Sequence, residues 1–233
     1  MSASSFNPDL YETYLLNIFK SVLKHIFFSY NEIIHDGKTV RKNSKGIDVN
    51  NGMPLENSLT NMLLKYLQDP ASKKRFGLEL CGFLAEPAAI NDNNKTEGFI
   101  DIFVTSVTSK FTGANDESIY FAFECKRLNH SNYANYVDKG ILRFITCKYS
   151  KKMSFAGMIG YCEEDKSDIK TIVDKINNNL NVKFKKRKIS ESSLDKFKIQ
   201  NDFYHCYISK HERKNLEPIE LYHLILDYSN IIE

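Results

Sequence analysis

The sequence contains no tryptophan and no apolar run of the ~18 residues that a membrane-spanning helix needs. Its five cysteines form no Cys-x-x-Cys pair, and several of them lie within apolar runs. This usage is typical of reduced thiols and argues against both a disulfide framework and a zinc site. The first residues also lack the basic and apolar segments of a secretory signal. We therefore expect a soluble, cytoplasmic protein that does not associate with membranes.

The chain also lacks a strong excess of one charge. Lysine and arginine number 32, aspartate and glutamate number 29, and the formal net charge is +3. Composition alone therefore does not indicate nucleic-acid binding, which would have to be supported by local clusters of charge. There is no His-x-His or His-Glu-x-x-His motif to suggest a transition-metal site.

What is present is an alternation of helical and extended patterns. Residues 8–35 and 54–69 carry apolar side chains at three- and four-residue steps, which predicts two amphipathic helices joined by a polar loop. Further helices are predicted at 132–149 and 163–182, and strands at 76–87, 99–109, 119–128, 153–162, 203–209 and 219–229, the last of which is also compatible with a short helix.

This order predicts one α/β domain over residues 1–233, with a central mixed β-sheet flanked by helices. The helix at 8–35 is expected to be an extra, accessory element. Residues 54–162 form the predicted core, and residues 163–233 a C-terminal extension that completes the sheet.

The strand predicted at 119–128 ends on charged residues. Because side chains alternate between the two faces of a strand, Glu124 and Lys126 share one face. Asp101 interrupts the apolar run Phe-Ile-Asp-Ile-Phe-Val of the preceding strand, and lies near Glu124 if the two strands pair. Two neighbouring carboxylates repel unless a cation lies between them, and such oxygen ligands suit Mg²⁺. A lysine beside them could orient or deprotonate a water molecule, so the set predicts metal-assisted phosphodiester hydrolysis.

An acidic residue two positions before a lysine is a weak signal by itself. Four other such triplets occur, starting at Asp36, Glu164, Asp168 and Glu212. Only the triplet that starts at Glu124 ends an alternating apolar strand with an aspartate in the strand before it.

In this context the sequence Gly-Phe-Ile-Asp-Ile-Phe-Val, followed by Tyr-Phe-Ala-Phe-Glu-Cys-Lys-Arg-Leu, resembles the PD-(D/E)xK, or restriction-endonuclease-like, nuclease superfamily. The resemblance implies a restriction-endonuclease-like core over residues 54–162. It also implies Mg²⁺, with Mn²⁺ as a substitute, held by Asp101, Glu124 and the main-chain carbonyl of Cys125, with Lys126 as the lysine of the motif. Proteins of this superfamily often add a glutamate from a preceding helix, for which Glu56 is the candidate.

One departure from the pattern is that Ile100, and not proline, precedes Asp101. The helix after the Glu-x-Lys strand commonly adds a polar residue in this superfamily, and Tyr136, Lys139 and Arg143 are the candidates. Lys139 and Arg143 are four residues apart on one expected helix face, where both could contact a phosphate.

The basic run 183–188, which includes Lys185, Lys186 and Arg187, is either a phosphate-binding strip or a solvated loop. His205 and His223 are expected to be core histidines with satisfied hydrogen bonds, because they lie in apolar runs. His211 and Arg213 are expected in a surface turn, with contact to nucleic acid as the alternative.

Each main candidate has a purely structural alternative. Glu124 and Lys126 could form an exposed ion pair across strands, and Asp101 could cap a turn or pair with a basic residue. Glu56 could be favoured by the helix dipole alone, because it falls in a first helical turn.

Three functions remain open. The first is an Mg²⁺-dependent endonuclease that hydrolyses DNA, for which restriction or anti-phage defence is the expected setting by fold analogy alone. Such an enzyme would be a homodimer if it cuts both strands, and could act with partner defence proteins. The second is a non-catalytic nucleic-acid-binding or complex-assembly module with a nuclease-like fold. The third is an RNA-cleaving effector, because RNA backbone hydrolysis uses the same groups.

Overall fold

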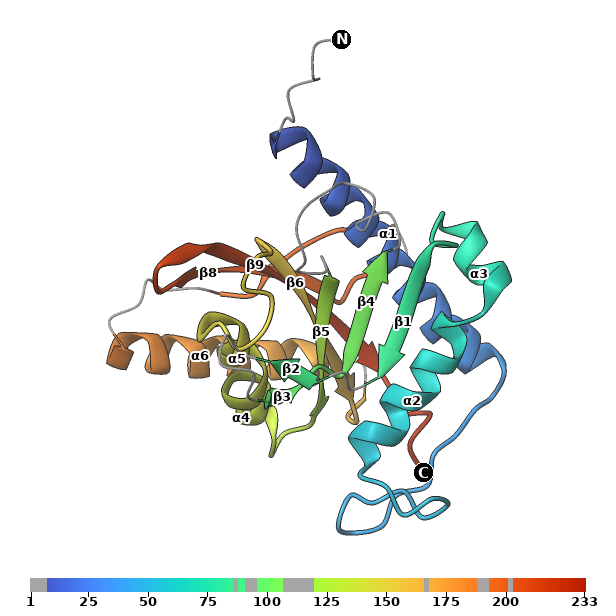
Figure 1. The fold of residues 1–233 in the computed structure, drawn as a ribbon. Coiled ribbons are helices and arrows are strands. Elements are labelled where there is room, and N and C mark those ends of the chain that lie inside the picture. Colours follow the sequence, from blue (N-terminus) through green and yellow to red (C-terminus); the bar gives the residue numbers. More distant parts are fainter. Residues whose placement is uncertain are drawn as a thin grey trace.

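The computed structural model describes residues 8–85, 88–90, 96–106, 120–165, 168–187, 193–200 and 203–233. Seven strands form a mixed sheet in the order β1-β4-β5-β6-β9-β8-β7, and two more form a separate ladder, β2-β3 (Figure 1). The strands are β1 (Cys81–Ala85), β2 (Ala88–Ile90), β3 (Thr96–Phe99), β4 (Ile102–Ser106), β5 (Tyr120–Leu128), β6 (Phe155–Cys162), β7 (Asp195–Lys196), β8 (Cys206–Arg213) and β9 (Leu216–Asp227).

Strand direction changes within this sheet. β1, β4 and β5 are antiparallel neighbours, whereas β6 runs parallel to β5 on one side and to β9 on the other. Parallel neighbours need a long crossover, which helices supply both between β5 and β6 and between β6 and β9. The hairpin of β8 and β9 and the short β7 complete the other edge of the sheet.

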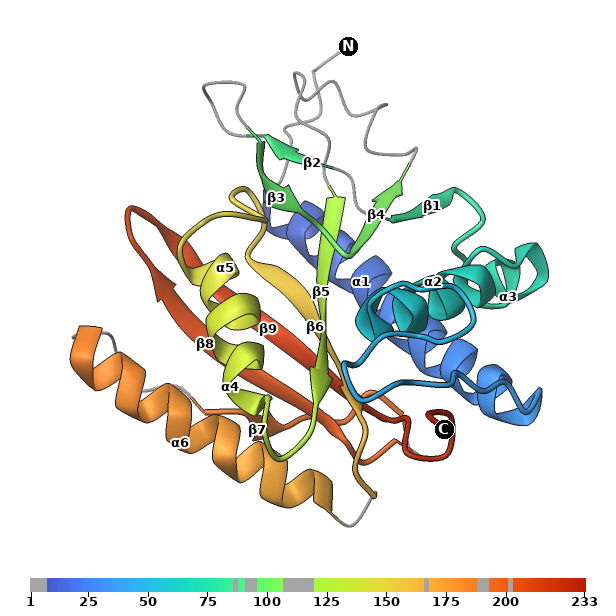
Figure 2. The same cartoon turned by 90° about the horizontal axis from the view of Figure 1, so that it is seen from below.

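Helices cover both faces of the sheet (Figures 1 and 2). On one side lie α1 (Pro8–His35), α2 (Leu55–Leu67) and α3 (Pro70–Arg75). On the other lie α4 (Tyr133–Tyr136), the π-helical segment η2 (Val137–Ile141), α5 (Leu142–Ile145) and α6 (Ile169–Arg187). The prediction of an α/β domain with a central mixed sheet, flanked by helices that include an N-terminal one, is confirmed.

The two faces of β5 belong to different hydrophobic clusters. Phe121, Phe123 and Cys125 pack in the cluster that contains α1 and α2, whereas Ala122 packs with α4, η2 and α5. This is the alternation that the sequence predicted for the strand. Phe19 of α1 is fully buried at the centre of the first cluster, with its ring 4.9–5.4 Å from four aromatic rings, those of Phe121, Phe123, Phe155 and Tyr222.

Several predicted boundaries differ from the structure. The strand predicted at 76–87 is β1 alone, and helix α3 was not predicted because Pro70 was interpreted as the end of the preceding helix. Pro70 instead begins α3, and the side chain of Asp69 accepts a hydrogen bond from the Ser72 amide at 2.7 Å, as an N-cap does.

The predicted helix at 132–149 is divided into α4, η2 and α5 and ends at Ile145. The helix predicted at 163–182 begins at Ile169 and continues to Arg187, so the backbone of residues 183–187 is helical and not a loop. The segment 219–229 lies mostly in strand β9, which settles the choice between strand and helix. The connection between the predicted strands 99–109 and 119–128 lies outside the described residues. In the described part of the chain, no helix combines the length and apolar character needed to cross a membrane.

Candidate active site

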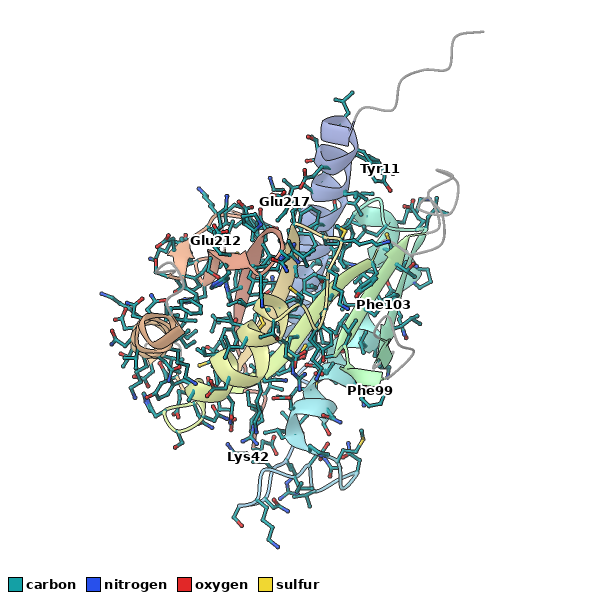
Figure 3. All side chains as sticks on the ribbon, turned by 60° about the vertical axis from the view of Figure 1, so that its left-hand side comes forward. Tyr11, Lys42, Phe99, Phe103, Glu212 and Glu217 are labelled. Carbon is teal, nitrogen blue, oxygen red and sulfur yellow. The ribbon has the colours of Figure 1, made fainter. Side chains whose placement is uncertain are left out.

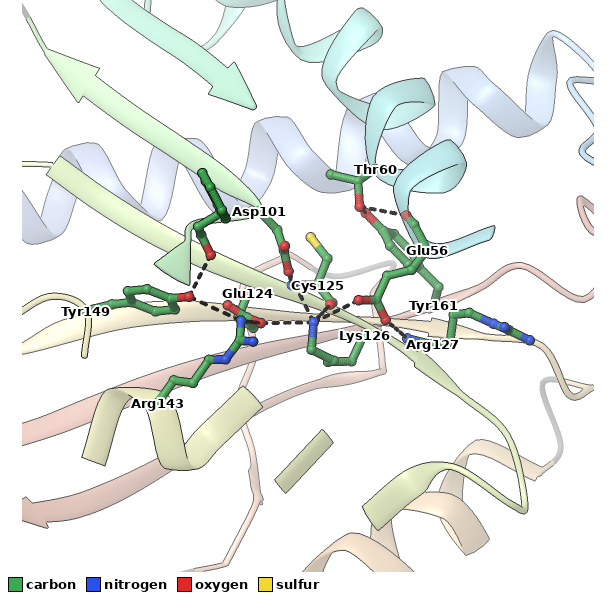
Figure 4. Close-up of polar contacts among 11 residues, drawn as sticks. Glu56, Thr60, Asp101, Glu124, Cys125, Lys126, Arg127, Arg143, Tyr149 and Tyr161 are labelled. Carbon is green, nitrogen blue, oxygen red and sulfur yellow. Dashed lines mark hydrogen bonds and ion pairs between the residues drawn. The ribbon is translucent and has the colours of Figure 1, made fainter. Parts of the chain in front are cut away.

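Three separated segments bring the four predicted site residues together (Figure 4). Glu124 and Lys126 lie on β5, and Glu56 lies in the first turn of α2. Asp101 directly precedes β4, and the pairing of Ile102 with Phe123 in the antiparallel ladder puts Asp101 beside Glu124. The predicted pairing of these two strands is therefore confirmed.

The ammonium group of Lys126 lies among oxygen atoms from all of these segments. Its Nζ is 2.8 Å from Glu56 Oε1, 2.9 Å from Glu124 Oε1 and 3.3 Å from Asp101 Oδ2. It also donates a short hydrogen bond to the main-chain carbonyl of Cys125. The site thus places three carboxylates and one carbonyl oxygen around a single positive charge.

Burial is uneven across the site. The Glu124 side chain is 0% exposed and that of Lys126 8%, whereas Asp101 is 21% and Glu56 29% exposed. Solvent therefore reaches the site from the side of Asp101 and Glu56. The alternative of an exposed cross-strand ion pair is wrong for Glu124 and Lys126.

Backbone hydrogen bonds fix the two more exposed carboxylates. Asp101 Oδ2 accepts a hydrogen bond from the Cys125 amide at 2.7 Å, and Glu56 Oε2 accepts one from the Arg127 amide at 3.1 Å. Thr60 Oγ1 donates to the Glu56 carbonyl at 2.9 Å and lies 3.0 Å from the hydroxyl of Tyr161 on β6. The first turn of α2 is thereby tied to the sheet, so Glu56 does more than interact with the dipole of its helix.

Arg143 adds a second cation to the site. Its guanidinium pairs with Glu124 Oε1 and donates to the Tyr149 hydroxyl at 3.1 Å. Tyr149 in turn donates to the carbonyl oxygen of Phe99 at 2.6 Å. Arg143 was predicted as a phosphate contact, but here it is bound to a carboxylate of the site.

The pKa values of Glu124 and Asp101 are raised despite these cations. Burial and the nearby Asp101 raise the pKa of Glu124 to about 8, although Lys126 and Arg143 act in the opposite direction. Burial likewise raises the pKa of Asp101 above its ordinary value, against the effects of Lys126 and the Cys125 amide. In both cases burial is the largest cause, and the nearby cations do not fully offset it.

The pKa of Lys126 is also raised, but for a lysine this favours the charged form. Burial by itself would lower the pKa of the Lys126 ammonium, but Glu124, Asp101 and Glu56 outweigh burial and raise it above the ordinary value. The lysine therefore holds its proton firmly, and can donate hydrogen bonds but is a poor base.

Among the described side chains, Tyr136 and Lys139 form no hydrogen bond or ion pair with this cluster. Tyr136 is buried, and its hydroxyl lies 3.0 Å from Nδ1 of the buried His223, so it belongs to the core. Lys139 is exposed on η2. The backbone of Lys185, Lys186 and Arg187 ends helix α6, and their side chains lie outside the described residues.

The prediction of a surface turn for His211 and Arg213 is wrong. Both lie in β8 and are buried. Arg213 is compensated by three carbonyl oxygens, those of Ser150, Met153 and Glu217, at 2.8, 3.1 and 2.7 Å. Ser209 Oγ lies 2.7 Å from Nε2 of both His211 and His223, so His223 is a hydrogen-bonded core histidine as predicted.

Two polar features beside the site were not predicted. The buried Glu163 carboxylate accepts hydrogen bonds from Arg127 at 2.6 and 2.9 Å and from Lys42 at 2.7 Å. Burial opposes ionisation of Glu163, but Arg127 and Lys42 outweigh it and lower its pKa. No local pattern indicated this cluster, because its members come from three distant parts of the chain.

The second unpredicted feature is a group formed by His130, Glu164 and Asp168. In the described residues this is the group of three whose ligand atoms all lie within 4.8 Å of one another. Lys175 Nζ lies 3.1 Å from His130 Nδ1, so a cation is already present at its edge. The carboxylates of the predicted site do not meet that spacing, because the Lys126 ammonium lies between them.

The predicted site nevertheless fits a hard divalent cation in its chemistry. Oxygen atoms of Glu56, Asp101, Glu124 and the Cys125 carbonyl already surround one cation, and oxygen is the ligand that Mg²⁺ prefers. Glu124 Oε2 is buried and has no hydrogen-bond partner among the described residues, so one carboxylate oxygen is left over. A divalent ion would have to displace the Lys126 ammonium from its central position. Comparison of the chain with family models, curated proteins and solved structures yields no match.

Proposed function

We propose that this chain is an Mg²⁺-dependent nuclease that hydrolyses DNA phosphodiester bonds. The observation that carries this proposal is the convergence of oxygens from Glu56, Asp101, Glu124 and Cys125 on one cation, the Lys126 ammonium. Burying charged groups costs free energy of folding unless they are well compensated. Clusters of buried ionisable groups with perturbed pKa values are typical of functional sites.

The order of elements around the cluster supports a restriction-endonuclease-like core. Helix α2 precedes strands β1, β4 and β5, which are followed by the helical crossover and strand β6. Apart from α3 and the β2–β3 ladder, the order is helix, three strands, helical crossover and strand, as expected for such a core. The two motif strands, β4 and β5, are adjacent, and their charged residues lie at the end where they meet α2.

Each residue of the cluster then has a defined role. Asp101, Glu124 and the Cys125 carbonyl would hold Mg²⁺, with Glu56 as a further ligand. When bound, the ion supplies positive charge that stabilises the pentacoordinate transition state and acidifies bound water. Lys126, which holds its proton, orients the attacking water and donates hydrogen bonds to the phosphate oxygens. Arg143 fixes the orientation of Glu124.

A non-catalytic nucleic-acid-binding module is the second candidate, and one observation favours it. Lys126 and Arg143 already pair with the carboxylates, so the cluster could simply hold α2, β4 and β5 together. Against this, three carboxylates face only two cations, and the pKa values of Glu124 and Asp101 are raised. RNA is a possible substrate of the same chemistry. A place in restriction or anti-phage defence, as a homodimer or with partner proteins, is proposed by analogy with the superfamily alone.

The test is cleavage of plasmid DNA, linear duplex DNA, single-stranded DNA and RNA with Mg²⁺ or Mn²⁺. Lys126→Ala should reduce the rate by roughly 100- to 1,000-fold, the usual effect of removing one donor that stabilises transition-state charge. Lys24→Ala is the matched control, because Lys24 is exposed on α1, which packs against the face of β5 opposite to that of Glu124 and Lys126. Unchanged cleavage by Lys126→Ala, or cleavage in EDTA, would overturn the proposal.

A further inference from the structure

A basic loop, residues 41–47, lies between α1 and α2. Arg41, Lys42 and Lys45 are exposed, and the segment contains no acidic residue. The next carboxylate, Asp48, is buried and accepts hydrogen bonds from the Asn50 amide and the Asn51 side chain, so it does not neutralise the exposed cations. Lys42 is paired with Glu163, so the positive surface of the loop comes from Arg41 and Lys45, which form no ion pair among the described residues.

Hydrogen bonds hold this loop in one conformation. The Asn43 amide donates to the Ile47 carbonyl at 3.0 Å, and Asn43 Oδ1 accepts from the Lys45 and Ile47 amides at 2.9 and 3.1 Å. The Lys42 amide donates to the Glu233 carbonyl at 2.8 Å, which ties the loop to the C-terminal residues. Because the backbone of the loop is held in place, a ligand would not have to order it.

The loop also contacts residues that are adjacent in sequence to those of the candidate active site. The Gly46 carbonyl accepts a hydrogen bond at 3.0 Å from the amide of Leu55, the residue before Glu56. A Cβ atom at Gly46 would lie 2.4 Å from Arg127 Nη1, and Arg127 follows Lys126. Lys42 and Arg127 share the Glu163 carboxylate. In Figure 3, Lys42 lies at the opposite end of the molecule from Glu212 and Glu217 of the β8–β9 hairpin.

We propose that the basic loop binds the phosphate backbone of duplex DNA beside the bond that the site hydrolyses. This inference rests on the proposed function. Exposed lysine and arginine side chains bind phosphates and supply the electrostatic part of DNA affinity. Single strands are held largely by stacking on aromatic rings, and residues 36–53 contain no aromatic residue. The loop is therefore suited to a duplex backbone and not to unpaired bases.

The test compares two double variants that remove the same charge. Arg41→Gln/Lys45→Gln changes the basic loop but leaves Lys42 bound to Glu163, and Lys210→Gln/Lys214→Gln changes exposed residues on and beside β8. Binding of a fluorescein-labelled duplex, and of the corresponding single strand, is measured by anisotropy at several salt concentrations in EDTA. No hydrolysis occurs under these conditions, and unfolding midpoints confirm that both variants fold.

The plot of log K against log salt has a negative slope, and in the loop variant its magnitude should be smaller by about 1.8. This corresponds to about 0.9 for each of the two duplex phosphates that the loop no longer neutralises. Its affinity at about 0.1 M salt should fall by roughly 10- to 100-fold, because a change of about 1.8 in the slope corresponds to a change of this size in K for each tenfold change in salt concentration. The control should stay within about twofold of the unchanged protein. Equal slopes in the loop variant and the unchanged protein, an equal decrease in the control, or tighter binding of the single strand would overturn the inference. If the protein cleaves DNA in a metal-dependent way but the loop variant binds duplex DNA as well as the unchanged protein, only the role of the loop is refuted. If duplex binding depends on the loop but no cleavage is observed, the proposed nuclease function is refuted.

Discussion

Replacing Glu124 by glutamine should change how the stability of the protein depends on pH. Burial and Asp101 raise the pKa of Glu124 from 4.5 to about 8 in the folded protein. Because the unfolded chain ionises near the ordinary value, the folded protein binds the additional proton between these two values. The free energy of unfolding must then fall as pH rises through this window. Burial lowers the pKa of His25, His211 and His223, so their effect on stability falls mainly below their ordinary pKa of about 6.5, where it opposes that of Glu124.

The size of the effect follows from the width of the window. From about pH 6.5 to about 8, the free energy of unfolding of the unchanged protein should fall by up to about 2 kcal/mol, at 1.36 kcal/mol per pH unit for one proton. Glu124→Gln has no proton to lose at this position and should fall by correspondingly less. Asp101→Asn should lie between the two, because the neighbouring Asp101 charge helps to raise the pKa of Glu124.

The assay is urea unfolding in EDTA at constant ionic strength across this range, so that no divalent ion competes with the proton. Parallel curves of stability against pH for the unchanged protein and Glu124→Gln would refute the reasoning. A rise in the stability of the unchanged protein across the window, with Glu124→Gln flat, would refute it as well.

Three further predictions concern the frame of the site. Phe19→Ala should destabilise the protein by about 3–5 kcal/mol in urea unfolding, because the ring is fully buried among four others, and a decrease below about 1 kcal/mol would contradict this core. Gly46→Ala should be more destabilising than Gly52→Ala, since both have φ near +70° but only the first also displaces Arg127; equal destabilisation would argue against the proximity of Gly46 and Arg127. Glu163→Gln should destabilise by about 1–3 kcal/mol at neutral pH. The lowered pKa of Glu163 means that this stabilisation is present above its ordinary pKa of 4.5 and is lost as pH falls. A difference in free energy of unfolding between the unchanged protein and Glu163→Gln that increases at acidic pH would contradict this.

Much of the site could be predicted because it depends on short-range regularities. Side-chain alternation along β5 places Glu124 and Lys126 on one face, and antiparallel pairing with β4 brings Asp101 opposite Glu124. Glu56 could be proposed only through a resemblance, since nothing in its own helix distinguishes it from an acidic residue favoured by the helix dipole. Its contacts with Lys126 and the Arg127 amide depend on how α2 packs across the sheet.

The rest depends on contacts between distant residues. Arg143 was placed on a regular helix facing a ligand, but the segment before it is a π-helix, which changes the rotation per residue, and its guanidinium turns to Glu124. His211 and Arg213 were assigned to the surface from their polarity. Carbonyl oxygens about 60 residues away make burial of Arg213 tolerable, and no local pattern predicts such partners.

The most direct test of the central claim is calorimetric titration with Mg²⁺ or Mn²⁺ of the unchanged protein, Asp101→Asn and Asp168→Asn. We predict one metal-binding event in the unchanged protein, its loss in Asp101→Asn and its retention in Asp168→Asn. Asp168 belongs to the other cluster of possible ligands, with His130 and Glu164, so it is the appropriate control. Absence of binding by the unchanged protein, or binding that is lost in Asp168→Asn and kept in Asp101→Asn, would contradict a metal site at Asp101 and Glu124.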